Sequence, residues 1–339
     1  MTADARTGRR TEASVRRGAA APAAERKREL LTYWAYRAAE RLLGSLPRGL
    51  VLPVASAAGN AAYDAAGAKR ALIAANLGQA MGLPADDRRV ARAARRAFRN
   101  YAKYLVDVMR FPSLTDADAD RLVAIDNVDI LDEARAGGTG VLICTVHVGA
   151  MDMIGPGLKR AGEVLHVVAD DTTYGRLYDH LKAVRAAHGF HLIGWRNLRG
   201  LFKVLRGGGN LVLFCDGGYR PGDVPVEFLG AATTFPAGPA TLSARSGAPM
   251  VPVWAQRTGR DTFVARGLPL IRAASDEPAE IHRATQELAD ALGGVIAADP
   301  GQWYMFRPIW PQTDADRAAA AAALDRARRG EDWTKPAAS

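Results

Sequence analysis

Apolar side chains recur along this chain with two different spacings, and the spacing changes near residue 112. Before that point they come at steps of three and four residues, which is typical of helices that bury one face. This spacing predicts helices over residues 30–46, 49–66, 68–81 and 87–110. Residues 1–28 carry no such face and are rich in Ala, Arg, Gly and Thr, so we expect a disordered basic tail.

Beyond residue 112, short buried runs alternate with helical stretches. The runs predict strands over 140–146, 164–169, 190–193, 210–215, 250–255 and 262–266, and the stretches between them predict helices over 152–162, 174–188, 197–206, 238–247 and 277–298. This alternation is typical of an α/β fold, in which a mainly parallel central sheet is flanked by helices on both faces. We therefore expect an all-helical region at 29–112, an α/β domain at 113–315 and a C-terminal helix or tail at 316–339.

One stretch, residues 141–152, combines the strongest strand pattern with reactive side chains. Its apolar run is typical of a strand buried on both faces and ends at His147, with Asp152 five positions later. The end of such a strand lies at the carboxyl edge of the sheet, where α/β proteins bind their ligands. Gly149 permits a turn that brings the two side chains together. A carboxylate on one imidazole nitrogen leaves the other nitrogen free as a base.

The His-x4-Asp spacing has a second interpretation. A histidine at a strand end can hydrogen-bond a loop carbonyl and have no chemical role, and an aspartate at a helix start is favoured as a cap. The spacing by itself does not separate the two interpretations, so further patterns are needed.

The charge of the chain favours anionic partners. Its 339 residues carry a net charge of +9, which suits anionic lipid, nucleic acid or an acidic carrier. No base-stacking module is recognisable, so we expect no nucleic-acid partner. The two cysteines, Cys144 and Cys215, both end apolar runs and are expected as buried thiols. Neither lies at a zinc-binding spacing, and we expect no metal.

No apolar run reaches the roughly 18 residues that cross a bilayer, and no secretory signal pattern is visible. We therefore expect a protein that is cytosolic or lies on a membrane surface. In the predicted helix 30–46, Tyr33, Trp34 and Tyr36 near the start suit an interfacial helix. Packing of the same face in the core is an equally good explanation.

Several blocks together resemble the glycerophospholipid-type acyltransferases. Residues 147–152 resemble their His-x4-Asp box, and the neighbourhood is most similar to the branch with the lipid A late acyltransferases and the phosphatidylinositol mannoside acyltransferases. Residues 235–242 and 246–253 resemble the second box of this branch, and Pro300-Gly301-Gln302-Trp303 resembles its C-terminal Pro-x-x-Trp. After the strand at 210–215 the mannoside branch typically carries Glu-Arg-Asp, whereas this chain has Asp216-Gly217-Gly218.

The resemblance implies an O-acyltransferase that moves a fatty acyl chain from acyl-CoA or acyl carrier protein to a hydroxyl of a lipid or glycolipid. His147 is then the general base, and Asp152 orients its imidazole. No covalent enzyme intermediate is needed, because a thioester is already activated, and the resemblance implies no cofactor. A lysophospholipid or glycerol-phosphate acyltransferase would use the same dyad with another acceptor, and a thioesterase would use it with water.

The reaction also needs hydrogen-bond donors for the oxyanion that develops on the carbonyl. Backbone amides near Gly149 or around Gly238 are the candidates. Gly238 and Pro239, at a predicted helix start, are also candidates for substrate binding.

Four side chains are candidates for substrate binding. Asp216, at a strand end, suits the hydroxyls of a sugar acceptor. Arg185 and Arg220 suit the donor phosphates or an anionic lipid head, with a surface ion pair as the alternative. Glu227 is a candidate for shaping the acceptor pocket. We expect a peripheral protein on the cytoplasmic face of the plasma membrane, held by an apolar helical face and basic side chains, with membrane lipids as partners, and we expect a monomer.

Overall fold

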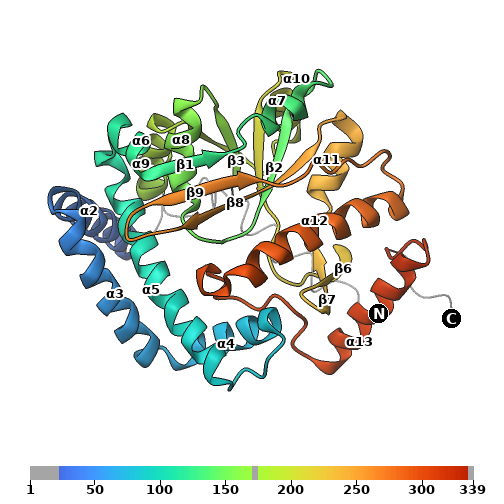
Figure 1. The fold of residues 1–339 in the computed structure, drawn as a ribbon, viewed down its shortest axis with the longest axis horizontal. Helices are drawn as coiled ribbons and strands as arrows, with labels where there is room; N and C mark the ends of the chain where they lie inside the picture. Colours follow the sequence, from blue (N-terminus) through green and yellow to red (C-terminus); the bar gives the residue numbers. More distant parts are fainter. Residues whose placement is uncertain (1–22, 170–174, 335–339) are drawn as a thin grey trace.

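The structure, a computed structural model, describes residues 23–169 and 175–334 (Figure 1). Four long helices come first and cover one side of the molecule: α2 Ala23–Ser45, α3 Arg48–Ala65, α4 Gly67–Met81 and α5 Arg88–Arg110. These bounds agree closely with the four predicted helices, except at the start of α2. Its first turns fall in the segment predicted to be disordered, and residues 1–22 of that tail lie outside the described residues.

The centre of the molecule is a seven-stranded sheet in the order β1-β9-β8-β2-β5-β3-β4. Its neighbouring strands run parallel except for the antiparallel pair β8–β9. The predicted α/β fold with a mainly parallel sheet is therefore confirmed. The strands are β1 Val123–Asp126, β2 Val141–Thr145, β3 Leu165–Ala169, β4 Phe190–Gly194, β5 Asn210–Phe214, β8 Met250–Arg257 and β9 Phe263–Gly267.

Strand β2 is buried on both faces, as its apolar run predicted. Leu142 and Cys144 belong to one core, on the face covered by α5, α11 and α12. Val141 and Ile143 belong to a second core, on the face that α8 covers. Successive side chains of a strand point to opposite faces, so β2 supplies both cores and lies at the middle of the fold.

The remaining helices connect the strands or follow the sheet. They are η1 Phe111–Ser113, α6 Asp116–Leu122, α7 Ile130–Arg135, η2 Met151–Met153, α8 Ile154–Arg160, α9 Gly175–Ala187, α10 Leu198–Arg206, α11 Gly238–Ser246, α12 Pro278–Ala298, η3 Pro300–Gln302 and α13 Asp314–Arg328. The predicted C-terminal helix corresponds to α13. Both cysteines are free and buried.

Sequence reasoning missed the edge strand β1 and a separate hairpin of β6 Val224–Phe228 and β7 Ala231–Phe235. The hairpin turns at Leu229 and Gly230, both with positive φ (51° and 80°). Such turns normally carry Asn or Gly at the first position. A leucine there, together with Pro225 inside β6, conceals the hairpin pattern.

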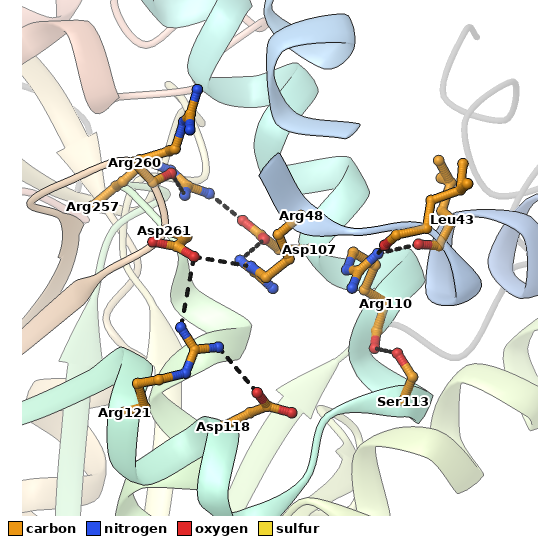
Figure 2. Close-up of polar contacts among 11 residues, drawn as sticks. Leu43, Arg48, Asp107, Arg110, Ser113, Asp118, Arg121, Arg257, Arg260 and Asp261 are labelled. Carbon is orange, nitrogen blue, oxygen red and sulfur yellow. Dashed lines mark hydrogen bonds and ion pairs between the residues drawn. The ribbon is translucent and has the colours of Figure 1, made fainter. Parts of the chain in front are cut away.

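A buried ion-pair network joins the helical region to the sheet (Figure 2). Asp107 of α5 accepts a hydrogen bond from Arg48 of α3 at 2.6 Å and pairs with Arg257 at the end of β8. The side chains of Asp107 and Arg257 are only 1% and 5% exposed. The charges are thus removed from water and depend on one another for compensation.

Replacing Asp107 by Asn should therefore destabilise the protein by about 3–5 kcal/mol, because it leaves the Arg257 guanidinium buried without a carboxylate. Urea unfolding followed by circular dichroism measures this. The matched control is Asp64→Asn, which breaks an exposed pair with Arg95 and should cost about 1 kcal/mol or less. Equal shifts in the two variants would contradict the assignment of the network as a structural tie.

Candidate active site

The loop after β2 turns sharply and places His147 at the carboxyl edge of the sheet. Gly149 has φ +68°, and a Cβ atom there would lie 1.9 Å from the carbonyl oxygen of Ala255. Only glycine fits this position, as the sequence predicted for the turn. The Gly149 N–H donates to the carbonyl of Gln302 at 2.9 Å. It is thus already paired and is not available as an oxyanion donor.

Asp216, directly after β5, is the carboxylate that holds His147. Its Oδ1 lies 2.7 Å from Nδ1 of the imidazole, and its Oδ2 accepts the backbone N–H of His147 at 2.9 Å. The indole N–H of Trp303 donates to the same Oδ2 at 2.9 Å. These contacts fix the imidazole with its proton on Nδ1, so that Nε2 is left as the basic nitrogen.

The environment keeps Asp216 ionised. Its side chain is fully buried, and burial alone would raise the pKa of the carboxyl. The His147 ring, the Trp303 indole and the His147 backbone N–H outweigh burial, and the pKa of Asp216 is lowered. A negative charge beside Nδ1 stabilises the imidazolium that forms when Nε2 takes a proton.

The predicted partner of His147, Asp152, makes different contacts. The Tyr104 hydroxyl of α5 donates to its Oδ2 at 2.6 Å, and Arg185 Nε of α9 donates to its Oδ1 at 2.8 Å. Burial opposes ionisation, but Arg185 and Tyr104 prevail and lower the pKa of Asp152. The expectation that Asp152 orients the imidazole is therefore wrong in this structure. The short helix η2 begins at Met151 and directs Asp152 toward α5 and α9 instead.

Two substrate-binding predictions change for the same reason. Asp216 was expected to bind a sugar hydroxyl, but its oxygens are buried and taken by His147 and Trp303. Arg185 was expected to bind donor phosphates or a lipid head, with an ion pair as the alternative, and in the structure its Nε pairs with Asp152 while the side chain is 25% exposed. Each residue supports another side chain of the site.

The other candidates do not line the cavities beside His147. Glu227 of β6 forms an exposed pair with Arg328 of α13 at 2.5 Å and lines neither cavity beside His147. Arg220 is exposed on the loop after β5. Gly238 and Pro239 form the first turn of α11, and neither lines the two cavities described below.

Tyr104 was not among the predicted site residues. Its only signal in the sequence was its place in the aromatic part of α5, which is also typical of core packing. Trp303 had a stronger signal, because it ends the Pro-x-x-Trp block, although its bond to Asp216 could not be read from that block.

An apolar cavity of about 360 Å³ opens beside His147 and runs down one face of the sheet. Its other walls come from α8 and α9, and Asp152, Arg185 and Tyr104 lie among its lining residues. The pairing of β2, β5, β3 and β4 arranges the strand side chains in three rows. The rows are Thr145 and Phe214 at the carboxyl edge, Ile143, Val212, Val167 and Leu192 in the middle, and Leu165 and Phe190 at the far end.

Comparisons with known proteins identify the family of the chain. A family model described as bacterial lipid A biosynthesis acyltransferase matches residues 21–312. A phosphatidylinositol mannoside acyltransferase of Mycobacterium tuberculosis is 30% identical over 218 residues, which cover 62% of this chain and 68% of the relative. The protein of the same name from Mycolicibacterium smegmatis is 28% identical over 284 residues, 81% of this chain and 90% of the relative.

Among solved structures, the 1-acyl-sn-glycerophosphate acyltransferase PlsC from Thermotoga maritima matches with a TM-score of 0.35 and 12% identity, over 74% of this chain and 97% of that one. The family match covers both the helical region and the α/β domain, and the resemblance to the mannoside acyltransferase branch is confirmed. The chain is an O-acyltransferase and belongs to the bacterial lipid A biosynthesis acyltransferase family.

Proposed function

We propose that this protein transfers a fatty acyl chain from a thioester, acyl-CoA or acyl carrier protein, to a hydroxyl of a glycolipid at a membrane surface. The observation that carries the proposal is the position of His147. Its Nδ1 is held by the buried Asp216 carboxylate, and its side chain lies at one end of an apolar cavity, 39% exposed. A general base that a carboxylate orients and balances in charge thus lies next to a cavity that can hold an alkyl chain.

The chemistry follows from this pairing. Nε2 of His147 takes the proton of the acceptor hydroxyl as its oxygen attacks the thioester carbonyl. The negative charge of Asp216 balances the imidazolium. The tetrahedral intermediate collapses, the C–S bond breaks, and the imidazolium returns the proton to the leaving thiolate. The products are an ester and a free thiol, and no covalent enzyme intermediate is required.

Asp152 has a positioning role in this scheme. Arg185 and Tyr104 hold its carboxylate, and its backbone lies in η2, five residues beyond His147. The two bonds tie the loop after β2 to α5 and α9, so that the wall of the cavity is fixed where it meets the catalytic histidine. Asp152 acts through the loop and does not touch the imidazole.

Two features support a glycolipid as the acceptor. The relatives from two mycobacterial species are named for a phosphatidylinositol mannoside, whose sugars offer hydroxyls. The cavity beside His147 is mostly lined by apolar strand residues and suits the acyl chain, which leaves the polar side of the histidine for the acceptor.

Helices α2 and α3 supply an exposed apolar surface that suits a bilayer. Leu31, Trp34 and Leu42 share one face of α2 and are 72%, 57% and 60% exposed, and Leu50 and Val54 of α3 are 63% and 69% exposed. Large side chains exposed in such number on neighbouring helices are typical of an interaction surface. Lys27, Arg28 and Arg41 of α2 are also exposed and suit anionic lipid head groups.

The opposite face of α2 lies beside the active site. Glu40 accepts a hydrogen bond from His180 of α9 at 2.8 Å. The Tyr36 hydroxyl is buried, and the charges of Arg185 and Asp152 both act on its pKa. None of the helices in the described part of the chain is apolar over a bilayer-spanning length. The proposal therefore places the protein on the cytoplasmic face of the plasma membrane, where thioester donors occur, with α2 between the lipid and the site.

The first prediction concerns the dyad. His147→Ala and Asp216→Asn should each lower kcat about 100-fold or more, because the first removes the base and the second leaves the imidazolium unbalanced. Asp152→Asn should be milder, about tenfold, since Asp152 does not contact the ring. Transfer from palmitoyl-CoA to a glycolipid in detergent, followed by mass spectrometry, measures this.

The exposed Asp126→Asn, which breaks only a surface pair with Arg266, is the matched control and should leave kcat unchanged. A mild Asp216→Asn together with a severe Asp152→Asn would restore Asp152 as the partner of His147. Near-normal turnover in the purified His147→Ala variant would contradict the proposed function.

The second prediction concerns chain length. Val167 lies in the middle row of the cavity, so Val167→Phe should block the far end and shift the preferred donor from palmitoyl-CoA toward octanoyl-CoA. The ratio of kcat/KM for the two donors measures the shift. Val264→Phe, on β9 outside the cavity, is the control. An unchanged ratio in Val167→Phe would show that the chain binds elsewhere.

The third prediction concerns the membrane. Replacing Leu42 and Leu50 together by Glu should weaken binding to vesicles of phosphatidylcholine and phosphatidylglycerol on the order of 100-fold, since each leucine loses roughly 1.5 kcal/mol or more of apolar burial. Co-sedimentation measures this. Val164→Glu, at a position 42% exposed before β3, is the control. Equal sedimentation of both variants would exclude this face.

A further inference from the structure

A second groove, of about 310 Å³, also opens at His147. Its lining includes His147, Tyr104 and Met151, which also line the apolar cavity of about 360 Å³. Its other lining residues do not belong to that cavity. That lining comes from α5 and from the segment that follows η3. The catalytic histidine therefore stands between two compartments, one apolar and one of mixed character.

One wall of the groove is a set of aromatic rings. The ring of Tyr101 lies 5.6 Å from that of Tyr304 and 5.1 Å from that of Phe306, measured between centroids, and Tyr104 lies 6.0 Å from Tyr304. Rings at these separations pack on one another and form a continuous surface. Tyr101, Tyr104 and Phe306 of this set are partly exposed, and Tyr304 is buried behind them.

The aromatic wall is fixed relative to the catalytic residue. The N–H of Tyr304 donates to the carbonyl of His147 at 2.9 Å. The buried Asn76 of α4 donates through its amide nitrogen to the carbonyls of Met305 and Arg307, at 2.8 and 2.9 Å. The segment 304–307 is thus tied on one side to the strand-end loop and on the other to the helical region. The groove is preformed and does not need a ligand to assemble it.

Arg307 supplies a cation at the same groove. Its side chain is exposed, and it forms no ion pair with a carboxylate in residues 23–169 and 175–334. A Cβ atom on Gly218 would lie 3.9 Å from Cδ of Arg307, so the stem of Arg307 runs beside the turn after Asp216. At the neighbouring Gly217 a Cβ would meet nothing within 4 Å. The turn therefore leaves space at Gly217, one residue from the glycine beside the stem of Arg307.

We propose that this groove binds the head group of the acceptor, with a sugar or cyclitol ring against Tyr101, Tyr304 and Phe306 and a phosphate on Arg307. The proposal rests on the proposed acyl transfer and deepens it. The group that gives up its proton must lie within hydrogen-bond reach of Nε2, so the acceptor needs a compartment that His147 itself lines. The C–H face of a hydroxylated ring packs on aromatic side chains, and a guanidinium is the preferred partner of phosphate.

The experiment separates acceptor from donor binding. Arg307→Ala and Tyr101→Ala are assayed with palmitoyl-CoA and two acceptors, phosphatidylinositol mannoside and uncharged glucosyl diacylglycerol. We expect Arg307→Ala to raise KM for phosphatidylinositol mannoside at least tenfold, with less than a twofold change for the uncharged glycolipid. Tyr101→Ala should raise KM for both acceptors. KM for palmitoyl-CoA should change less than twofold in both variants.

Arg245→Ala is the matched control. Arg245 lies in the last turn of α11, next to the start of β8 and thus at the amino edge of the sheet, and makes only an exposed pair with Asp276. It should leave every KM unchanged, and thermal melting should confirm that all three variants fold. If Arg307→Ala raises KM for palmitoyl-CoA instead, the groove holds the donor and the proposal is overturned. Unchanged KM values in Arg307→Ala and Tyr101→Ala would overturn it equally.

A binding measurement distinguishes this proposal from the proposed function. Calorimetry with deacylated phosphatidylinositol mannoside requires no turnover and uses the full chain. Binding to the wild type that weakens at least tenfold in Arg307→Ala supports the groove even if His147→Ala retains activity. Absence of binding to the wild type overturns the groove even if acyl transfer is demonstrated.

Discussion

A single buried carboxylate, that of Asp216, holds the active site together. Moving an ionised carboxylate out of water is expensive unless donors replace the lost hydration, and Asp216 receives three N–H groups. Two come from His147 at the end of β2, and the third comes from Trp303 after η3. Removing any one donor would leave a buried charge unsatisfied. The contacts that offset the cost of burying this charge therefore also fix the ends of β2 and β5 relative to Trp303 and to the segment 304–307 that follows it.

The site contains a second buried carboxylate, and the two do not compete for the histidine. Asp152 accepts hydrogen bonds from Arg185 and Tyr104, and these replace a contact with the imidazole. Each carboxylate has its own donors, and each has a lowered pKa for that reason. The site thus holds two negative charges. The guanidinium of Arg185 neutralises the one that does not touch the ring.

Sequence reasoning could place His147 and the architecture, but it could not place the partner of His147. The strand pattern, the turn at Gly149 and the helical spacing are local properties, and they predicted β2, its loop and the four N-terminal helices. The pairing of His147 with Asp216 joins residues 69 positions apart, through the neighbouring order of β2 and β5. Strand order is not a local property. Asp152 was the nearer carboxylate in the chain, and proximity in sequence favoured it although the turn directs its side chain elsewhere.

The sequence pattern did not predict the hairpin β6–β7 or the role of Tyr104, and the reasons are related. A leucine with positive φ at the turn contradicts the usual turn chemistry, so the hairpin depends on its surroundings and not on its own sequence. Tyr104 follows the spacing of a helix face that packs on the core, and the pattern of a buried ring is the same whether or not its hydroxyl has a role. Its function becomes visible only when α5 and η2 are seen side by side.

Helix α5 connects the features of this site. At successive steps of three residues it carries Tyr101, which lines the groove, Tyr104, which holds Asp152, and Asp107, which pairs with Arg48 and Arg257. Side chains at this spacing lie on adjoining faces of consecutive turns. Arg48 belongs to α3, whose outer face bears the exposed Leu50 and Val54. The position of the groove and of the loop that carries His147 relative to the exposed apolar surface is therefore set by a buried ion pair and a continuous helix. A protein that lies on a bilayer through α2 and α3 would hold His147 at a fixed distance from the lipid, because the buried pairs of Asp107 join α3 to α5 and to the sheet.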